Sequence, residues 1–374
     1  MTRSDKIMPS LVAYPMHGYH KFVREGFRTR DAHLISWAGK LLGPDARVLV
    51  NSRPEPFPRR VPAMWRAEPE PGLVDVGRSV LRLPPMRDRY TWWSKSTPLY
   101  RIPPYSADVP SVAWNPLVAS RLLERNSLRP RVLVVDLLDD WTIYPAYSGI
   151  RAEVEAAYAR VFSEADVIFA NSEGTQSLAH RYGRYDVVLM TNGVDPEEFR
   201  MDSRASGPTT VGYVGKIGSR LDYQLMSATV ANLPDVQFVI AGPALDGEAK
   251  RFLKSLPSNV RVLGDVHYRA MPDVLRTFDV GWIPHRVGAG EVGGDVIKLY
   301  EYRAAGLPVL TTPIRGVQER GLSDVHSLEA DHHMRWIGSL ASQGARVARS
   351  PQRFPAEHTW RHKAETLIRT AGLK

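Results

Sequence analysis

Short apolar runs recur through the 374-residue chain, and each ends in glycine or polar residues before a segment with helical periodicity. The first run spans 11–14, and a helix-period segment over 29–42 separates it from the next, at 46–51. Similar runs lie at 131–136, 166–170, 186–190, 210–214, 236–242, 260–263, 278–283 and 308–312. Because parallel strands need crossover connections of a dozen or more residues, usually helical, this alternation predicts an α/β chain with parallel sheets.

The bulk properties of the chain narrow its class. Its length exceeds what one hydrophobic core usually serves, so we expect two domains, joined by the polar, turn-rich stretch 200–208. The longest apolar runs are interrupted well short of a bilayer span, and the first residues lack the apolar core of a signal peptide. The absence of cysteine excludes disulfides and thiolate metal sites and fits a cytoplasmic protein.

The formal charge of +9 and the pI near 9.7 favour an anionic partner. A nucleotide, an anionic membrane leaflet and a nucleic acid are all negatively charged and would be attracted by this net charge. The basic residues are scattered rather than run together, so the charge alone does not choose among them.

The segment 291–310 carries most of the functional information. Gly293 and Gly294 precede a run of helix formers that ends at Gly306, and the β-branched stretch 308–312 follows, so we expect a loop, a helix, a tight turn and a strand. On that helix Asp295, Lys298 and Glu301 recur every three residues and share one face.

This face suits a nucleotide. A glycine loop that leads into a helix N-terminus offers backbone N–H groups and a positive dipole end to a phosphate, and Lys298 adds a point charge. Glu301, one turn further on, is a pair of acceptors suited to the two hydroxyls of a ribose. The alternative is an ordinary surface helix on which Lys298 and Glu301 form a solvated pair.

The order of residues in this segment also resembles a known family. Lys298-Leu-Tyr-Glu-Tyr302 is followed by small residues and Gly306-Leu-Pro-Val309, and this pattern resembles the donor-nucleotide helix of GT-B glycosyltransferases, specifically family 4. Ala-Asn-Ser at 170–172 and Asn-Gly-Val-Asp at 192–195 resemble the end of the first domain in the same family.

The resemblance implies an α/β fold of the GT-B type, with two Rossmann-like parallel-sheet domains facing a central cleft. The N-terminal, acceptor-side domain is expected over 1–200 and the nucleotide-sugar-binding domain over 201–355. Residues 356–374 are expected to form a terminal helix that crosses back to the first domain, with Trp360 packed at the junction.

Several residues are predicted to bind the donor. The loop after the strand at 210–214 contributes basic residues that contact the diphosphate in related enzymes, and the loop after the strand at 260–263 presents groups to the nucleobase. The first loop of the chain faces the donor across the cleft. The predicted donor-binding residues are Gly18, Lys216, Arg220, Val266, His267, Gly294, Asp295, Lys298, Leu299 and Glu301.

Catalytic candidates lie where strands of the first domain end. Asp136, Asp139 and Asp140 lie at the carboxyl end of the strand at 131–136, and His17 follows the first strand. An acid there can act as a general base on an acceptor hydroxyl, so we predict Asp140 as the catalytic residue, Asp139 as second choice, and His17 as a further candidate. Asp139-Asp140-Trp141 can instead form a turn and helix cap, and His17 can be a structural loop residue.

The implied reaction is transfer of a sugar from a nucleoside diphosphate, expected to be UDP, to an acceptor hydroxyl, with no cofactor besides this co-substrate. No Asp-x-Asp pair lies where a metal would bind the nucleotide, so we expect a metal-independent mechanism. Family 4 enzymes usually place a second glutamate eight residues before the ribose-binding one, and here that position is Gly293. We expect retention of configuration from the resemblance, and this departure leaves inversion open.

The acceptor side has a different composition. The stretch 53–110 is rich in proline and arginine and contains the aromatic residues Trp65, Tyr90, Trp92, Trp93, Tyr100 and Tyr105. These can form an acceptor-binding edge, a membrane-contacting patch or a plain core. The acceptor itself, whether a small molecule, a lipid-linked glycan, a protein or DNA, cannot be read from the sequence, and peripheral membrane contact fits the charge.

Three other functions remain open on the sequence alone. A DNA-base glucosyltransferase of GT-B architecture would use the basic charge for duplex DNA. A GT-B-like epimerase or phosphorylase would turn over a donor without an acceptor. A sugar-binding protein without transferase activity would bind the nucleotide only.

Overall fold

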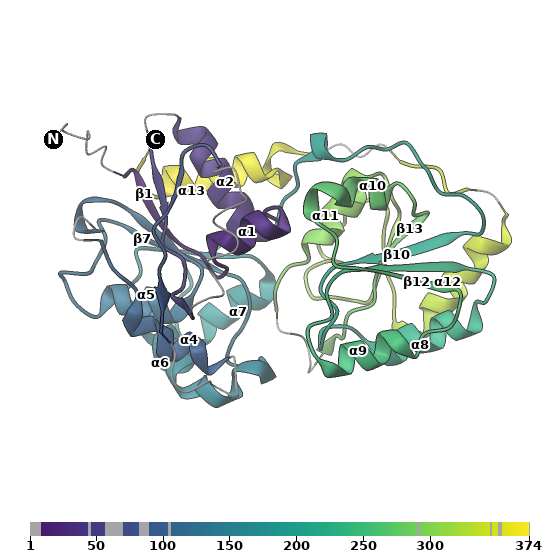
Figure 1. Cartoon of the computed structure of the whole chain (residues 1–374), viewed down its shortest axis with the longest axis horizontal. Coiled ribbons are helices and arrows are strands. Elements are labelled where there is room, and N and C mark those ends of the chain that lie inside the picture. The colour runs from purple at the N-terminus through teal and green to yellow at the C-terminus, as the bar shows by residue number, and fades with distance from the viewer. Residues whose placement is uncertain are drawn as a thin grey trace. The chain divides into compact units, whose positions relative to one another are not determined.

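The computed structural model of the chain describes residues 9–43, 46–56, 70–81, 90–103, 106–288, 291, 293–344, 346–350 and 354–373. The chain divides into two compact units (Figure 1). Unit 1 comprises Met1–Asn192, Val292–Asp295 and Trp360–Lys374, and unit 2 comprises Gly193–Glu291 and Val296–Thr359. Each unit is built around a parallel sheet, which confirms the predicted α/β class.

The described part of unit 1 holds a seven-stranded sheet in the order β4-β2-β1-β6-β7-β8-β9, with parallel pairing throughout. Its strands are β1 (Leu11–Tyr14), β2 (Val48–Val50), β4 (Leu73–Asp75), β6 (Ser111–Ala113), β7 (Leu133–Leu137), β8 (Val167–Ala170) and β9 (Val188–Leu189). The short strands β3 (Glu55–Pro56) and β5 (Ser79–Val80) pair with each other beside it. The strands β4 and β6 were not predicted, because they lie within and directly after the proline- and arginine-rich stretch 53–110, where no longer apolar run marks a strand.

The helices of unit 1 are α1 (Tyr19–Glu25), α2 (Arg30–Leu42), α4 (Thr91–Ser96), α5 (Pro116–Leu123), α6 (Arg151–Glu164), α7 (Glu173–Arg181) and α13 (Trp360–Thr370). Helix α5 packs against α6, and α13 packs against α2 (Figure 1). The fully buried Trp360 of α13 stacks on the His33 ring of α2, with ring centroids 4.7 Å apart and planes 7° apart. The last helix is therefore a core element of unit 1.

The aromatic residues of the 53–110 stretch are largely core residues. Trp92, Trp93 and Tyr100 are buried, and Trp93 meets the buried Trp141 edge to face with ring centroids 5.2 Å apart. The Arg53 guanidinium lies over the Trp93 ring, 3.8 Å from its centroid. The plain-core interpretation therefore holds for these three residues, whereas Trp65 and Tyr105 lie outside the described residues.

Unit 2 has a six-stranded sheet among its described residues, in the order β12-β11-β10-β13-β14-β15, again with parallel pairing. Its strands are β10 (Thr210–Val214), β11 (Gln237–Ala241), β12 (Val260–Gly264), β13 (Val280–Ile283), β14 (Val309–Thr311) and β15 (Val325–Ser327). Its helices are α8 (Tyr223–Asn232), α9 (Gly247–Lys254), α10 (Met271–Leu275), α11 (Ile297–Ala304) and α12 (Ala330–Ser342). The stretch 315–321 forms turns, and β15 is the edge strand of the sheet.

Helices cover both faces of the second sheet. Figure 1 shows α10 and α11 on one face and α8 and α9 on the other. Asp222 and Asp246 cap α8 and α9 by accepting hydrogen bonds from first-turn N–H groups, which is why these two helices begin where they do. Two apolar clusters, one around Leu299 and Tyr302 and one around Met226 and Trp282, fill the space between helices and sheet.

A buried ion pair ties the strand ends of unit 1 together. The Arg30 guanidinium on α2 donates two hydrogen bonds to the Asp136 carboxylate on β7, at 2.8 and 3.0 Å, and the Trp114 indole donates a third at 2.6 Å. Arg30 also donates to the Thr191 carbonyl at 2.9 Å. Because both charges are almost wholly removed from water, each depends on the other.

We predict that Asp136→Asn lowers the free energy of unfolding by about 3–5 kcal/mol, because it leaves the Arg30 charge buried without its counter-ion. The control is Glu365→Gln, which removes an exposed pair with Arg361 on α13 and should cost less than about 1 kcal/mol. Urea unfolding followed by tryptophan fluorescence measures both. Equal, small losses in the two variants would contradict the prediction.

Candidate functional site

Charged side chains gather at the sheet edge where the strands of unit 2 end. Strands β10 and β13 are neighbours, yet the helices that follow them, α8 and α11, lie on opposite faces of the sheet (Figure 1). In open parallel sheets this divergence opens a crevice beyond the strand ends, where ligands collect. The loop 215–222 and the start of α11 border that position.

Helix α11 is fixed in place by its apolar side. Leu299 and Tyr302 are fully buried in the apolar cluster of unit 2. The Tyr302 hydroxyl accepts a hydrogen bond of 2.7 Å from the Val214 N–H at the end of β10, which binds the helix to the strand. Val296 caps the helix without a side-chain hydrogen bond to the first turn.

Lys298 lies across the end of β10. A methyl group on Gly215 would stand 2.8 Å from Lys298 Cε and 2.9 Å from the Tyr213 hydroxyl, so only glycine leaves room for this arrangement. The Lys298 ammonium is 5.3 Å from the centroid of the Tyr213 ring. Burial, reinforced by the nearby Arg220 and Lys216 charges and opposed by Glu301, lowers the pKa of Lys298 to about 8.

Glu301 follows one turn later and is 6% exposed. Burial raises the pKa of its carboxyl group to about 7, although a hydrogen bond from the Tyr268 hydroxyl and the charge of Lys298 act in the opposite direction. Tyr268 begins a short 3-10 turn, Tyr268–Ala270, just after β12. Lys298 and Glu301 thus lie one turn apart on α11, with Glu301 buried and Lys298 half-buried, and their role in binding a nucleotide stays a prediction.

The loop after β10 holds two further basic residues, Lys216 and Arg220, both half-buried. The Tyr213 hydroxyl donates a hydrogen bond of 3.0 Å to the Lys216 carbonyl, and the Arg220 carbonyl accepts one of 2.8 Å from the Arg286 N–H. Arg220 and Lys216 also influence the pKa of Lys298, so these three cations share one neighbourhood.

His285 adds a neutral imidazole to this group. It follows β13, is 8% exposed, and has its ring centroid 6.5 Å from that of Tyr213. Burial, together with the charges of Lys298 and Arg220, holds the pKa of His285 well below its usual value.

Close backbone packing shapes the same edge. The Gly242 N–H donates a hydrogen bond of 2.6 Å to the Gly264 carbonyl, and a methyl group on Gly242 would lie 1.8 Å from the Gly215 carbonyl oxygen. Gly215 and Gly242 also have positive φ angles of 148° and 145°. The loops after three neighbouring strands are thus held near one another because no side chains separate them.

Val266 and His267 lie in the loop after β12. Val266 packs partly against the apolar cluster around Leu299, and His267 is exposed, with its Nδ1 accepting a hydrogen bond of 3.4 Å from the Arg269 N–H. Leu299, also predicted to bind the donor, has its side chain wholly in the core. Its contact with a ligand would have to come from its backbone.

The predicted residues in the first loop of unit 1 lie close to a buried acid. The His17 N–H donates to the Asp31 carboxylate at 3.1 Å, and His17 Nδ1 is 3.5 Å from the same oxygen. Burial alone would raise the pKa of Asp31, but hydrogen bonds from His17 and Thr29 and the charge of His17 lower it to about 2. Gly18 caps α1.

The Asp140 carboxylate is buried, and both of its oxygens have polar partners. Its Oδ1 accepts hydrogen bonds from the N–H and the hydroxyl of Thr142, at 2.9 and 2.5 Å, and its Oδ2 pairs with Arg181. These contacts match the turn-forming role considered as the alternative to catalysis. Asp139 is half-buried, and its backbone carbonyl accepts a hydrogen bond of 3.1 Å from Tyr158.

Gly294 and Asp295 group with unit 1 rather than with the donor-side unit in which they were predicted. The Asp295 carboxylate accepts a hydrogen bond of 2.7 Å from the Asn192 N–H. A methyl group on Gly294 would stand 2.1 Å from Asp139 Oδ1. Their predicted contact with a nucleotide stays a prediction.

Sequence reasoning missed several residues of these sites, namely Tyr213, Tyr268, His285, Arg30 and Asp31. Tyr213 and Asp31 lie inside regular elements, where tyrosine and aspartate carry no motif of their own. Only the position of His285 and Tyr268 just beyond predicted strands could have singled them out, since ligands gather at such strand ends.

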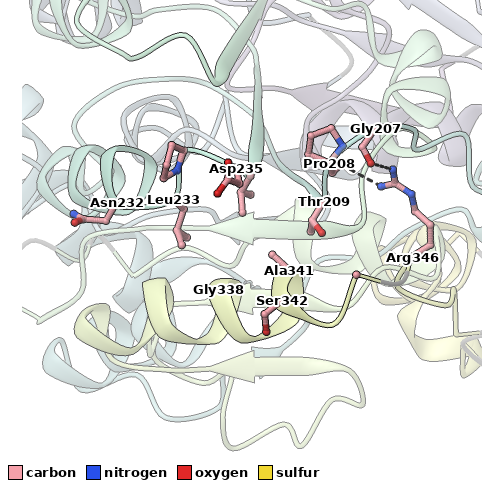
Figure 2. Close-up of a pocket in the computed structure, with 13 residues that line it drawn as sticks. Gly207, Pro208, Thr209, Asn232, Leu233, Asp235, Gly338, Ala341, Ser342 and Arg346 are labelled. Atoms are coloured by element: carbon pink, nitrogen blue, oxygen red, sulfur yellow. Dashed lines mark hydrogen bonds between the residues drawn. The ribbon is translucent and has the colours of Figure 1, made fainter.

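A separate pocket of about 450 Å³ lies at the opposite, amino-terminal end of β10 and β11. Figure 2 shows its lining residues, among them Asn232, Asp235 and Arg346. The Arg346 guanidinium donates to the Pro208 carbonyl at 3.2 Å and pairs with Asp279 at 2.6 Å. This pocket is distinct from the charged edge around Lys298.

Neither a metal-binding cluster nor a membrane-spanning helix occurs among the described residues. No three His, Asp or Glu side chains there are grouped as a metal site would require. No described helix combines the length and apolarity needed to cross a bilayer.

Comparisons with known proteins bear on this site. Residues 208–331 match the family model described as glycosyl transferases group 1. That range includes the strands β10 to β15 and the residues Lys216, Arg220, Lys298 and Glu301. The charged edge of unit 2 thus lies within the matched segment.

Solved structures extend the likeness to the whole chain. The Anabaena HepE crystal structure with UDP and glucose is 16% identical, covers 98% of both chains, and has a TM-score of 0.63. Sucrose-phosphate synthase from Thermosynechococcus elongatus is 12% identical, covers 98% of this chain and 97% of its own, and has a TM-score of 0.68. The chain has the GT-B fold. The predicted resemblance to GT-B glycosyltransferases is thereby confirmed, while the family 4 assignment stays a prediction.

A curated relative of this GT-B protein is a putative teichuronic acid biosynthesis glycosyltransferase, TuaH, from Bacillus subtilis (strain 168). The two are 26% identical over 203 residues. The match spans about half of each protein, 50% of this chain and 51% of the relative.

The buried charges of the GT-B site should cost stability. Folding raises the pKa of the Glu301 carboxyl group from 4.5 to about 7. The free energy of unfolding therefore falls as the pH rises between these values, and the full cost of the buried carboxylate is present above pH 7. A lysine whose pKa falls from 10.5 to about 8 carries its full cost below pH 8. Near pH 7.5 both costs are close to their maximum.

We therefore predict that Lys298→Met and Glu301→Gln each raise the melting temperature of the nucleotide-free protein by about 2 °C or more at pH 7.5. Each change removes a charge that folding has to desolvate. Thermal unfolding measures the effect, with the exposed Lys250→Met on α9 as a control that should change the melting temperature little. A lower melting temperature in both site variants would show that these charges support the fold.

Proposed function

We propose that this protein is a glycosyltransferase that moves a sugar from a UDP-sugar donor to an acceptor hydroxyl. Helix α11 and the loop after β10 form the proposed donor site. The observation that carries the proposal is the pair Lys298 and Glu301, one helical turn apart at the strand ends of unit 2, with Glu301 buried and Lys298 half-buried. The group 1 family match over 208–331 and the UDP held by Anabaena HepE support it.

The chemistry follows from charge. When the bond between the sugar and the β-phosphate breaks, negative charge builds up on the departing diphosphate, and a fixed cation lowers the energy of that state. Lys298, Lys216 and Arg220 can offer this charge, and the N-terminus of α11 adds its positive dipole end. We propose that these groups hold the diphosphate without a metal ion.

Glu301 is suited to the ribose. Two carboxylate oxygens can accept hydrogen bonds from neighbouring hydroxyls, and Tyr268 fixes the orientation of the carboxylate by donating to it. A buried acceptor leaves a large penalty for a ligand that lacks the matching hydroxyl, so this contact favours a ribonucleotide.

For the donor sugar we propose retention of configuration, following the family 4 resemblance. The usual second glutamate is absent, because Gly293 stands at its position. Two acids flank that position in the sequence and could substitute for it: Asp295 accepts a hydrogen bond from the Asn192 N–H, and Glu291 accepts one of 3.0 Å from the Arg315 N–H. Asp140, Asp139 and His17 remain the proposed catalytic residues.

The acceptor side is supported by the distribution of charge. Unit 1 contains 30 of the 49 lysines and arginines but only 22 of the 40 acidic residues, so nearly all of the net charge of +9 belongs to it. Arg78, Lys95 and Arg101 are exposed within the stretch 70–103. We propose that unit 1 meets an acceptor that carries negative charge, such as an anionic or lipid-linked glycan.

Simple assays separate this function from its alternatives. A DNA-base glucosyltransferase would bind duplex DNA with an affinity that falls steeply with salt. An epimerase or phosphorylase would convert a donor sugar with no glycosyl acceptor present. A binding protein without activity would take up UDP-sugar and release no UDP in any acceptor screen.

The first prediction of this function concerns UDP binding. Lys298→Met and Glu301→Ala should each weaken UDP by about tenfold or more, because each loses a charge-assisted contact, while both keep their fold. Isothermal calorimetry with UDP measures the affinities, and Lys250→Met serves as the surface control. Wild-type affinity in both site variants would refute the donor site.

The second prediction concerns pH. Binding needs Glu301 ionised and Lys298 protonated, so the affinity for UDP should fall below about pH 7 and again above about pH 8. In Glu301→Gln the acidic limb should disappear while the alkaline limb remains. A binding curve that is flat from pH 6 to pH 9, measured by calorimetry, would contradict this assignment.

A further inference from the structure

Tyr213 lies at the centre of the cationic group of unit 2. It is the second-last residue of β10 and is 2% exposed. Its ring and its hydroxyl both meet groups of the proposed donor site.

The ring lies beneath Lys298. The ammonium is 5.3 Å from the ring centroid, within the range in which the negative face of an aromatic ring attracts a cation. The lysine stem passes over Gly215, where a methyl group would stand 2.8 Å from Cε. Because residue 215 has no Cβ, the stem has room to bring the ammonium close to the Tyr213 ring.

The hydroxyl holds the loop. It donates a hydrogen bond of 3.0 Å to the Lys216 carbonyl, which fixes the turn that carries the Lys216 side chain. The bond links the end of β10 to the first basic residue beyond it. One side chain therefore acts on two cations that reach the site from different elements, Lys298 from α11 and Lys216 from the loop.

We propose that Tyr213 is a positioning residue for the diphosphate: its ring face places the Lys298 ammonium and its hydroxyl places the Lys216 loop. This inference rests on the proposed function for its ligand, but the ring contact exists without one. Tyr213 itself touches neither the sugar nor the reacting bond in this account.

Two variants separate the ring from the hydroxyl. Tyr213→Phe keeps the ring beneath Lys298 and deletes the bond to Lys216, whereas Tyr213→Leu deletes both. Tyr223→Phe is the control, because it removes another hydroxyl from the same unit, one with no hydrogen-bond partner among the described residues. Circular dichroism establishes that each variant is folded.

The first experiment needs no ligand. Reductive ¹³C-dimethylation keeps the lysine charge, and the Lys298 resonance is identified by its loss in Lys298→Met. We expect that resonance to be shifted upfield by the Tyr213 ring in the wild type and in Tyr213→Phe. In Tyr213→Leu the upfield shift should vanish and the apparent pKa of Lys298 should fall by about one pH unit.

The second experiment compares UDP with uridine by calorimetry. Because Tyr213 acts on the phosphate end, Tyr213→Phe should weaken UDP about threefold and Tyr213→Leu about tenfold or more, with uridine affinity unchanged. Tyr223→Phe should bind both like the wild type.

The outcomes are distinct. If Lys298 shows no ring shift in the wild type, or Tyr213→Leu leaves its resonance and pKa unchanged, the ring contact is refuted. If Tyr213→Phe keeps the wild-type ratio of UDP to uridine affinity, the role of the hydroxyl is refuted. If the NMR results are as expected but the wild type binds no UDP, both the proposed function and the assignment of the ligand as a diphosphate are refuted. The placement of Lys298 by the Tyr213 ring is then still supported.

Discussion

The placement of the half-buried Lys298 beside the buried Glu301 is the constraint on which the charged strand ends of unit 2 depend. Two opposite charges one helical turn apart would pair weakly on a surface, where solvent screens them. Here the apolar side of α11 anchors the helix, and Tyr302 bonds it to the end of β10. The charges are therefore held in a fixed place with altered proton affinities, as functional sites often require.

Unit 1 uses its buried carboxylates differently. Asp136, Asp31 and Asp140 all accept several hydrogen bonds from named partners, and two of them pair with arginines. A carboxylate saturated in this way orders the loops at the strand ends. The two units have the same kind of sheet, but unit 1 surrounds its buried acids with hydrogen-bond donors, while unit 2 gathers Lys298, Lys216 and Arg220 near its strand ends.

The sequence was sufficient to predict the alternation of strands and helices and the helix face shared by Lys298 and Glu301, because both follow from periodicity and spacing. It could not supply the loop geometry at the strand ends. Whether Asp140 is a base or a turn former depends on Thr142 and Arg181, one of which lies forty-odd residues away and approaches only in the fold. The role of Tyr213 likewise depends on Gly215 leaving space for a lysine from another element.

The stacking of Trp360 on His33 has a consequence for the order of events during synthesis. Helix α13 belongs to the core of unit 1, yet the ribosome makes it after all of unit 2. The residues of unit 2 are translated consecutively, apart from Val292–Asp295, which belong to unit 1. Unit 1, by contrast, is incomplete until α13 is made, and one side of α2 is uncovered until then. The nascent chain thus exposes an apolar surface on its older half until the youngest helix arrives, and it is there that a chaperone would be needed.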